Sequence, residues 1–137
     1  MPSIKTPKYR FFDHTADILY EAYGRDFKEA LENAAKAMFS VIGNAKEKRK
    51  INVHVKGENK ESLVVRFLET LLSESEIRDI VFSRVKVQTL DTQNFELFAI
   101  AYGEKKRPRN AVKAVTFHEL QINEGEGRCS IRILLDV

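Results

Sequence analysis

Apolar residues recur every three or four positions in two segments of the chain, which is the spacing of an amphipathic helix. The first predicted helix runs from Asp26 to Gly43. Asp26 can cap it, Glu29 follows at the spacing of a capping box, and Gly43 favours a stop. The second predicted helix covers Asn59 to Glu74. Its apolar stripe consists of Val64, Phe67, Leu68, Leu71 and Leu72.

Most of the remaining chain alternates between apolar and polar residues with period two, which predicts half-buried strands. An opening strand is expected to begin at about residues 12–18, and further predicted strands cover residues 51–56, 81–88, 95–103, 114–122 and 128–137. Turns rich in Asp, Asn and Gly join the later strands into hairpins. In the last strand Asp136 falls in the polar phase, so we expect its side chain to point away from the apolar layer.

This order of strand, helix, strand, helix and four strands predicts an α+β protein. We expect a two-layer sandwich, in which a mostly antiparallel or mixed sheet carries both helices packed on one face. A length of 137 residues suits one domain, and no repeat or linker divides residues 1–137.

Composition narrows the class of protein. A content of 43% hydrophobic and 31% charged residues is typical of a soluble globular chain. The longest apolar run, Leu97 to Tyr102, is far shorter than the roughly 20 residues that span a bilayer. We therefore expect no membrane association and a cytoplasmic location. The single cysteine, Cys129, lies in an apolar strand phase, where an inert buried thiol is expected.

The sequence lacks the common enzyme motifs, namely a Gly-rich phosphate loop, a Gly-x-Ser-x-Gly elbow and a Cys-x-x-Cys pair. Polar residues instead gather in three places. The first cluster contains Asp13, His14 and Asp17 just where a strand is predicted to begin. It is a turn, part of an oxygen-ligand metal site, or a general acid/base.

The second cluster is the C-terminus, where the Asp136 side chain and the Val137 α-carboxylate stand within one residue of each other. Such a pair repels itself unless a cation compensates the charge, although an exposed strand end is the alternative interpretation. The third cluster, residues 110–120, contains Lys113 and His118. Taken alone, they are a surface lysine and a hydrogen-bonded structural histidine.

The order and spacing of these clusters resemble one family, archease. The resemblance rests on three elements: Asp13 to Ile18 (Asp-His-Thr-Ala-Asp-Ile), Val112 to Leu120 with its Lys-Ala-Val-Thr-x-His pattern, and the closing Leu135-Asp136-Val137. The helix 26–43 and the stretch 101–104 also match, so the resemblance extends over nearly the whole chain. Phe117 stands where the family commonly has Tyr, and Cys129 where many members have a large aromatic residue.

The resemblance implies a non-enzymatic cofactor protein for an RtcB-type RNA ligase, which joins tRNA exon halves. In that family the archease promotes guanylylation and multiple turnover of the ligase and can broaden the nucleotide it accepts. The protein would contact tRNA exon halves only through the ligase. A divalent cation, usually Ca²⁺, is also implied, with Asp17, Asp136 and the Val137 carboxylate as ligands. The candidate supporting residues are Asp13, His14, Lys113 and His118.

Two other hypotheses come from different classes of protein. An RNA-binding or chaperone-like module would use the basic loop 105–109 and the strand face beside it. Most aromatic residues fall in apolar phases, which disfavours this module because single-stranded RNA binders expose aromatic rings on a sheet. A metal-dependent hydrolase would need a general base near the cation, and His14 is the nearest histidine in sequence.

Overall fold

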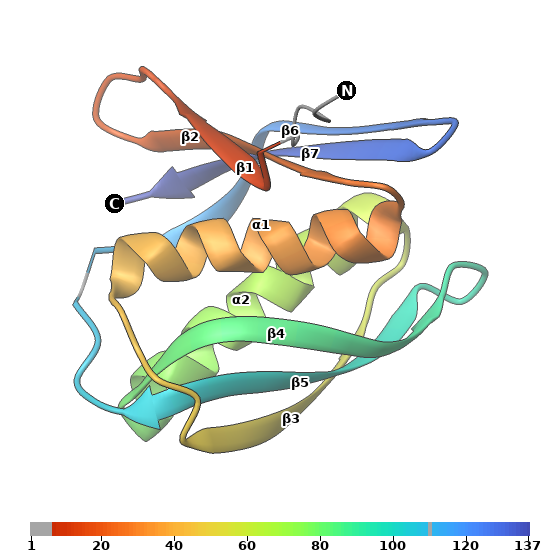
Figure 1. The fold of residues 1–137 in the computed structure, drawn as a ribbon. Helices are drawn as coiled ribbons and strands as arrows, with labels where there is room; N and C mark the ends of the chain where they lie inside the picture. The colour runs from red at the N-terminus through yellow and green to blue at the C-terminus, as the bar shows by residue number, and fades with distance from the viewer. Residues whose placement is uncertain (1–6, 110) are drawn as a thin grey trace, which may run out of the picture.

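The computed structural model describes residues 7–109 and 111–137, and it places two helices between two antiparallel sheets (Figure 1). Asn110, the first residue of the third polar cluster, lies outside the described residues. The helices are α1 (Phe27–Ile42) and α2 (Lys60–Arg78). The strands are β1 (Tyr9–Phe12), β2 (Ile18–Gly24), β3 (Arg49–Lys56), β4 (Ile80–Asp91), β5 (Glu96–Lys105), β6 (Ala114–Gly125) and β7 (Arg128–Asp136).

The α+β class and the antiparallel pairing are confirmed, and the arrangement of the strands needs one correction. A single sheet with both helices on one face was expected, whereas the strands form a four-stranded sheet, β1-β2-β7-β6, and a three-stranded sheet, β3-β5-β4. The physical reason lies in α1, which is buried on more than one side and contacts β2 and β7 of one sheet and β4 of the other. A helix buried in this way needs an apolar layer on both sides.

The chain also begins with one more strand than expected. Tyr9–Phe12 forms the edge strand β1, which pairs with β2 from Tyr9 opposite Ala22 to Phe12 opposite Leu19. Its four residues are too few for the period-two pattern to distinguish a strand from a loop. This hairpin turns the segment 13–17 into the connection between two paired strands.

The helix boundaries follow the sequence signals closely. The Asp26 side chain accepts a hydrogen bond from the Glu29 N–H at 2.8 Å, and the Gly43 N–H bonds the Phe39 carbonyl at 3.0 Å. At α2, Asn59 and Ser62 form a reciprocal capping box. Helix α2 runs one turn beyond the predicted end, because the last turn contributes the buried Ser75, whose hydroxyl donates to a carbonyl of β4.

The core lies on both sides of the helical layer. Tyr20 of β2 is fully buried, and its hydroxyl donates a hydrogen bond of 2.8 Å to the Ala34 carbonyl of α1. Burial raises the pKa of the Tyr20 hydroxyl far above its usual value, so the group stays a neutral donor.

No helix among residues 7–109 and 111–137 has the length and apolar character required to cross a bilayer.

Candidate functional site

The pairing of β2 with β7 brings the first and last polar clusters to the same end of the four-stranded sheet. Ile18 is opposite Leu135 in the antiparallel register. The next residues beyond this pair are Asp17 and Asp136, so the register brings both to the same end of the sheet. Val137 follows directly, and in Figure 1 the C-terminus lies on the same side of the molecule as the β1–β2 connection. We call Asp17, Asp136 and the α-carboxylate of Val137 the carboxylate site.

Strand β6 closes the other side of β7 at this end. Ala114 pairs with Asp136, and the Lys113 N–H donates a 2.7 Å hydrogen bond to the Asp136 carbonyl. The backbone of Asp136 is therefore held by its neighbour in the sheet, while its side chain stays exposed, as the strand phase predicted. Lys113 is also exposed, so a cationic residue stands next to the carboxylates.

The β1–β2 connection has a defined local conformation. Ala16 has a φ of 71°, in the left-handed region that non-glycine residues rarely adopt, and the Asp17 N–H bonds the Thr15 carbonyl at 2.9 Å. His14 Nδ1 lies 3.3 Å from the same carbonyl oxygen. Asp13 and His14 are both exposed, on the same connection as Asp17. The turn that the sequence suggested is present, and it sets the direction in which Asp17 enters β2.

His118 occupies a different setting from the one its strand phase predicted. The pairing of β6 with β7 is interrupted between Thr116 and Gln121, and Glu119 has a φ of 63°. His118 is exposed within this irregular stretch and no longer shares a regular phase with its neighbours. Phe117, also in this stretch, is 60% exposed. His118 thus lies in the first half of β6, four residues after Ala114, which pairs with Asp136, and it is not itself paired with β7.

An ion pair that the sequence did not predict lies on the outer face of the four-stranded sheet, the face that also carries the Asp136 side chain. Arg132 of β7 reaches the Glu21 carboxylate of β2 with an Nη2–Oε2 distance of 2.8 Å and an Nε–Oε2 distance of 3.0 Å. Its guanidinium also lies 5.2 Å from the centre of the Phe12 ring. Because Arg132 opposes Glu21 in the register, the pair joins the two strands that carry Asp17 and Asp136. Only the register reveals it, since the two residues are 111 positions apart.

The donor chemistry of the carboxylate site fits a hard divalent cation. Ca²⁺ prefers oxygen ligands, and three carboxylates offer up to about six oxygens. Within the described part of the chain, no group of three or more His, Cys, Asp or Glu side chains could hold a metal ion. A cation at this site would therefore need the main-chain carboxylate of Val137 in addition to the side chains of Asp17 and Asp136.

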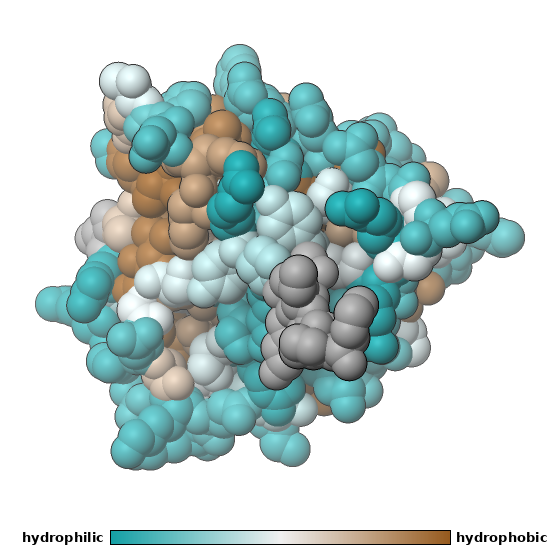
Figure 2. Space-filling model, turned by 45° about the horizontal axis from the view of Figure 1, so that its top comes forward, coloured by the Kyte–Doolittle hydropathy of each residue, from teal (hydrophilic) through white to brown (hydrophobic). Residues whose placement is uncertain are grey.

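The surface around this end of the sheet is partly apolar. Figure 2 shows the molecule with the four-stranded sheet turned toward the viewer, and an apolar area covers its left side, the side of the C-terminus in Figure 1. Phe117 and Val137 are among the exposed large hydrophobic residues, at 60% and 37%. Exposed apolar surface beside a charged cluster is typical of a protein interaction site.

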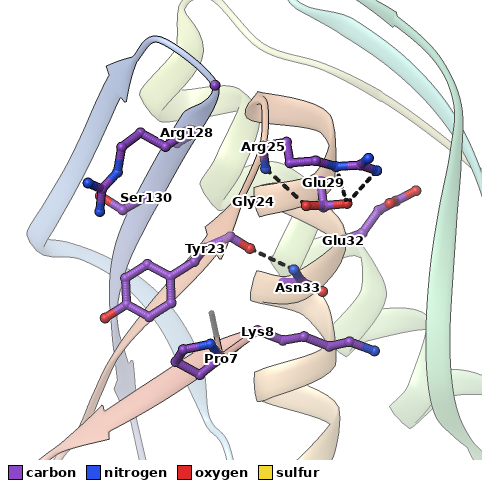
Figure 3. Close-up of a pocket in the computed structure, with 12 residues that line it drawn as sticks. Pro7, Lys8, Tyr23, Gly24, Arg25, Glu29, Glu32, Asn33, Arg128 and Ser130 are labelled. Atoms are coloured by element: carbon purple, nitrogen blue, oxygen red, sulfur yellow. Dashed lines mark hydrogen bonds and ion pairs between the residues drawn. The ribbon is translucent and has the colours of Figure 1, made fainter. Parts of the chain in front are cut away.

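A cavity of about 700 Å³ opens at the opposite end of β2, around Gly24 and Arg128 (Figure 3). Several of its polar groups are paired with one another. The Glu29 carboxylate accepts the Arg25 N–H at 2.9 Å and the Arg25 guanidinium at 3.0 Å, and Asn33 donates to the Tyr23 carbonyl at 2.6 Å. These contacts hold the start of α1 against β2, so we assign the cavity a structural role.

Cys129 lines the same cavity and behaves as the sequence predicted. Its side chain is buried, with 3% of the residue surface exposed. Burial raises the pKa of the Cys129 thiol to about 11. A thiol with this pKa is protonated at neutral pH and is a poor nucleophile.

The basic loop after β5 is held by the helical layer. The Lys106 N–H bonds the Asp79 carbonyl at 2.9 Å, the Lys106 ammonium donates to the Asn44 carbonyl at 2.8 Å, and the Arg109 N–H reaches Ile42 at 3.3 Å. These contacts cap the ends of α1 and α2. Part of the positive charge in residues 105–109 therefore serves the fold, while Lys105, Arg107 and Arg109 have exposed side chains.

Fold and site together define a class of small α+β proteins that enclose two helices between antiparallel sheets and present carboxylates where β2 and β7 meet. The archease protein family matches residues 9–137. The chain therefore belongs to the archease family.

Individual relatives agree with this assignment. The protein archease of Sulfolobus acidocaldarius is 38% identical over 138 residues, covering 95% of this chain and 99% of the relative. That of Pyrococcus abyssi is 37% identical over 140 residues, with the same coverage.

Solved structures share the fold. The solution structure of protein 1598 from Methanobacterium thermoautotrophicum has a TM-score of 0.79 and 35% identity, covering 95% of this chain and 99% of that one. The crystal structure of a Thermotoga maritima archease, described as a possible chaperone, has a TM-score of 0.71 and 19% identity, with full coverage of both chains. The second likeness concerns the fold alone.

Proposed function

We propose that this protein is a non-enzymatic activator of an RtcB-type RNA ligase in tRNA splicing, which promotes guanylylation of the ligase and its multiple turnover. The observation that carries the proposal is the meeting of Asp17 and Asp136 at one sheet end, next to exposed apolar surface. Membership in the archease family supports it. The partner is the ligase, and tRNA exon halves are contacted through it.

A divalent cation, Ca²⁺ by the chemistry of the ligands, would be held by Asp17, Asp136 and the α-carboxylate of Val137. When bound, it would supply positive charge next to the phosphates of the nucleotide that the ligase uses. The residues of this chain do the positioning. The bond from the Lys113 N–H to the Asp136 carbonyl holds the end of β7, and the turn at Ala16 directs Asp17 toward it.

The Arg132–Glu21 ion pair would keep β2 and β7 in register despite the repulsion between the carboxylates at their ends. Their ion pair is partly buried and bidentate at the guanidinium, which gives it a defined geometry. Lys113, His118, Asp13 and His14 are exposed around the site and are candidates for contacts with the ligase. The exposed ring of Phe117 would add apolar contact area.

A multiple-turnover ligation assay tests the proposal, with purified cognate ligase, GTP, a divalent cation and RNA substrate, in the presence and absence of this protein. We expect more product per ligase when the protein is present. Asp17→Asn and Asp136→Asn should remove most of the stimulation, while Glu126→Gln, an exposed carboxylate in the turn at the far end of β7, should retain it.

Two outcomes would contradict the proposal. Equal product with and without the protein would exclude activation of the ligase. Full stimulation by folded Asp17→Asn and Asp136→Asn proteins would show that the carboxylate site is not the working part. Far-ultraviolet circular dichroism of each variant separates a loss of function from a loss of folding.

A further inference from the structure

The outer face of the three-stranded sheet is open to solvent and carries aromatic rings. The strands β3, β5 and β4 bury one face against the helices, and the residues of the other phase face outward. Three consecutive cross-strand rows form the centre of this outer face, which we call the platform. The rows are Lys50–Tyr102–Arg84, Asn52–Ile100–Lys86 and His54–Phe98–Thr89.

The rings of the platform each pack one face against a neighbouring side chain and are partly exposed. His54 stacks on Phe98 with ring centres 4.2 Å apart and an angle of 1° between the planes, and Phe98 is 47% exposed. The Arg84 guanidinium lies 4.1 Å from the centre of the Tyr102 ring. Phe98 and Tyr102 are four residues apart on β5, a span of roughly 13 Å along a strand. Ile100 stands between them in the same phase.

The charged residues within the platform are all basic. Lys50, Arg84 and Lys86 contribute three cations, and none of the nine residues in the three rows is acidic. Carboxylates stand at its borders: Glu47 pairs with Arg84, Glu96 pairs with His54 at 2.6 Å, and the flanking rows also carry Asp91 and Glu104. The platform thus combines exposed rings with cations in one surface.

We propose that the platform binds single-stranded nucleic acid, with two or three bases stacked over Phe98 and Tyr102 and the phosphates beside Lys50, Arg84 and Lys86. Aromatic rings on an open sheet face, flanked by Lys and Arg, are the arrangement by which sheet proteins bind unpaired bases. An apolar protein partner fits less well, because cations and polar side chains surround the exposed rings. The two aromatic residues belong to β5, where the sequence pattern alone placed them within an apolar run.

This surface is separate from the carboxylate site, since the two lie on different sheets with the helices between them. It adjoins the loop 105–109, which begins at the last residue of β5 and whose backbone is held against the helices. The inference therefore stands independently of the proposed function. Its test contains neither a ligase nor a divalent cation.

The experiment is fluorescence anisotropy with a labelled oligonucleotide of about 12 nucleotides, as single-stranded RNA, single-stranded DNA and duplex. We expect both single strands to bind more tightly than the duplex. With three phosphate contacts, affinity should fall roughly 20-fold between about 50 and about 200 mM salt. Phe98→Leu, which keeps apolar volume and removes the ring, should weaken binding about tenfold.

Matched controls come from other surfaces of the chain. Phe117→Leu removes an exposed ring from the other sheet, and Lys28→Ala removes an exposed cation from α1. Both should bind as wild type does, whereas Tyr102→Leu should weaken binding and Lys86→Ala should also reduce the salt dependence. Circular dichroism confirms that each variant is folded.

Three results would overturn the inference. The first is no binding of either single strand by wild type at low salt. The second is equal affinity of wild type, Phe98→Leu and Tyr102→Leu. The third is a dimer of wild type that Phe98→Leu converts to a monomer by light scattering, because a second copy would then occupy the platform.

Discussion

Replacing Asp136 by Asn should change the stability of this protein in opposite directions with and without calcium. The side chain of Asp136 is exposed, and its backbone stays paired with Ala114 and bonded by Lys113. The substitution therefore removes a charge and leaves the fold in place. Without a cation, that charge repels its neighbours; with a cation, it becomes a ligand.

The magnitudes follow from the position of the residue. Facing residues of antiparallel strands lie about 5 Å apart, and two charges at that distance in water repel by about 0.8 kcal/mol, less with salt. Asp136→Asn should thus raise the Tm by up to about 3 °C in a chelator. A cation at 100 times its Kd stabilises the wild type by about 2.7 kcal/mol, or about 10 °C. If the loss of one carboxylate weakens cation binding about thirtyfold, the same calcium concentration raises the Tm of the variant by about 3 °C.

Differential scanning calorimetry of wild type and Asp136→Asn, in EDTA and in calcium, measures both effects. Glu126→Gln is the matched control, since it removes an exposed carboxylate from the β6–β7 turn and should shift with calcium as wild type does. A third set of scans in magnesium shows whether the site prefers calcium, the larger of the two ions.

Equal calcium shifts in wild type and Asp136→Asn would refute the reasoning, because the side chain could then not be a ligand. A lower Tm of the variant in EDTA would refute the electrostatic part. It would mean that Asp136 makes a stabilising contact in the cation-free protein.

Four further predictions concern the site and the fold. A Gly-Ser extension after Val137 removes one carboxylate from the site, so it should reduce the calcium shift from about 10 °C to about 3 °C and leave the Tm in EDTA unchanged. Tyr20→Phe should lower the Tm by about 4 °C, since it removes one buried hydrogen bond worth about 1 kcal/mol. Gly103→Ala should destabilise by about 1–3 kcal/mol in a urea titration, because a Cβ there would lie 2.3 Å from a main-chain oxygen of β4. The hydrogen bond from the Arg25 N–H and the Arg25 side chain lower the pKa of Glu29. The ionised Glu29 therefore stabilises the fold at neutral pH, and this stabilisation is lost as the pH falls below 4.5 and through the lowered pKa. Glu29→Gln should flatten the acid side of a plot of Tm against pH.

Local signals were sufficient for the helices and for most strands. Asp26 and Gly43 bound α1 as the capping pattern predicted, because caps depend on residues within one turn. The apolar stripe of α2 is buried as expected. The edge strand β1 and the irregular stretch around His118 were missed, since both depend on a neighbouring strand.

The carboxylate site, too, could be predicted only in part from the sequence. The polar clusters at residues 13–17 and 136–137 stand out in the sequence, but no pattern along the chain says that they meet. The resemblance to archease supplied that expectation, and the register of β2 with β7 brings the two aspartates to one sheet end. The Arg132–Glu21 pair and the accessible rings of Phe98 and Tyr102 were found only in the structure.

The sequence by itself determined the elements, the α+β class and the polar segments, because propensity, capping and periodicity act between residues a few positions apart. The tertiary structure decided how strands divide into two sheets, which face of each sheet meets the helices, and which distant residues become neighbours. Those outcomes depend on burying α1 from two sides and on pairing strands from opposite ends of the chain. Both candidate surfaces arise at that level, one at the joined ends of β2 and β7 and the other on the open face of β3, β5 and β4.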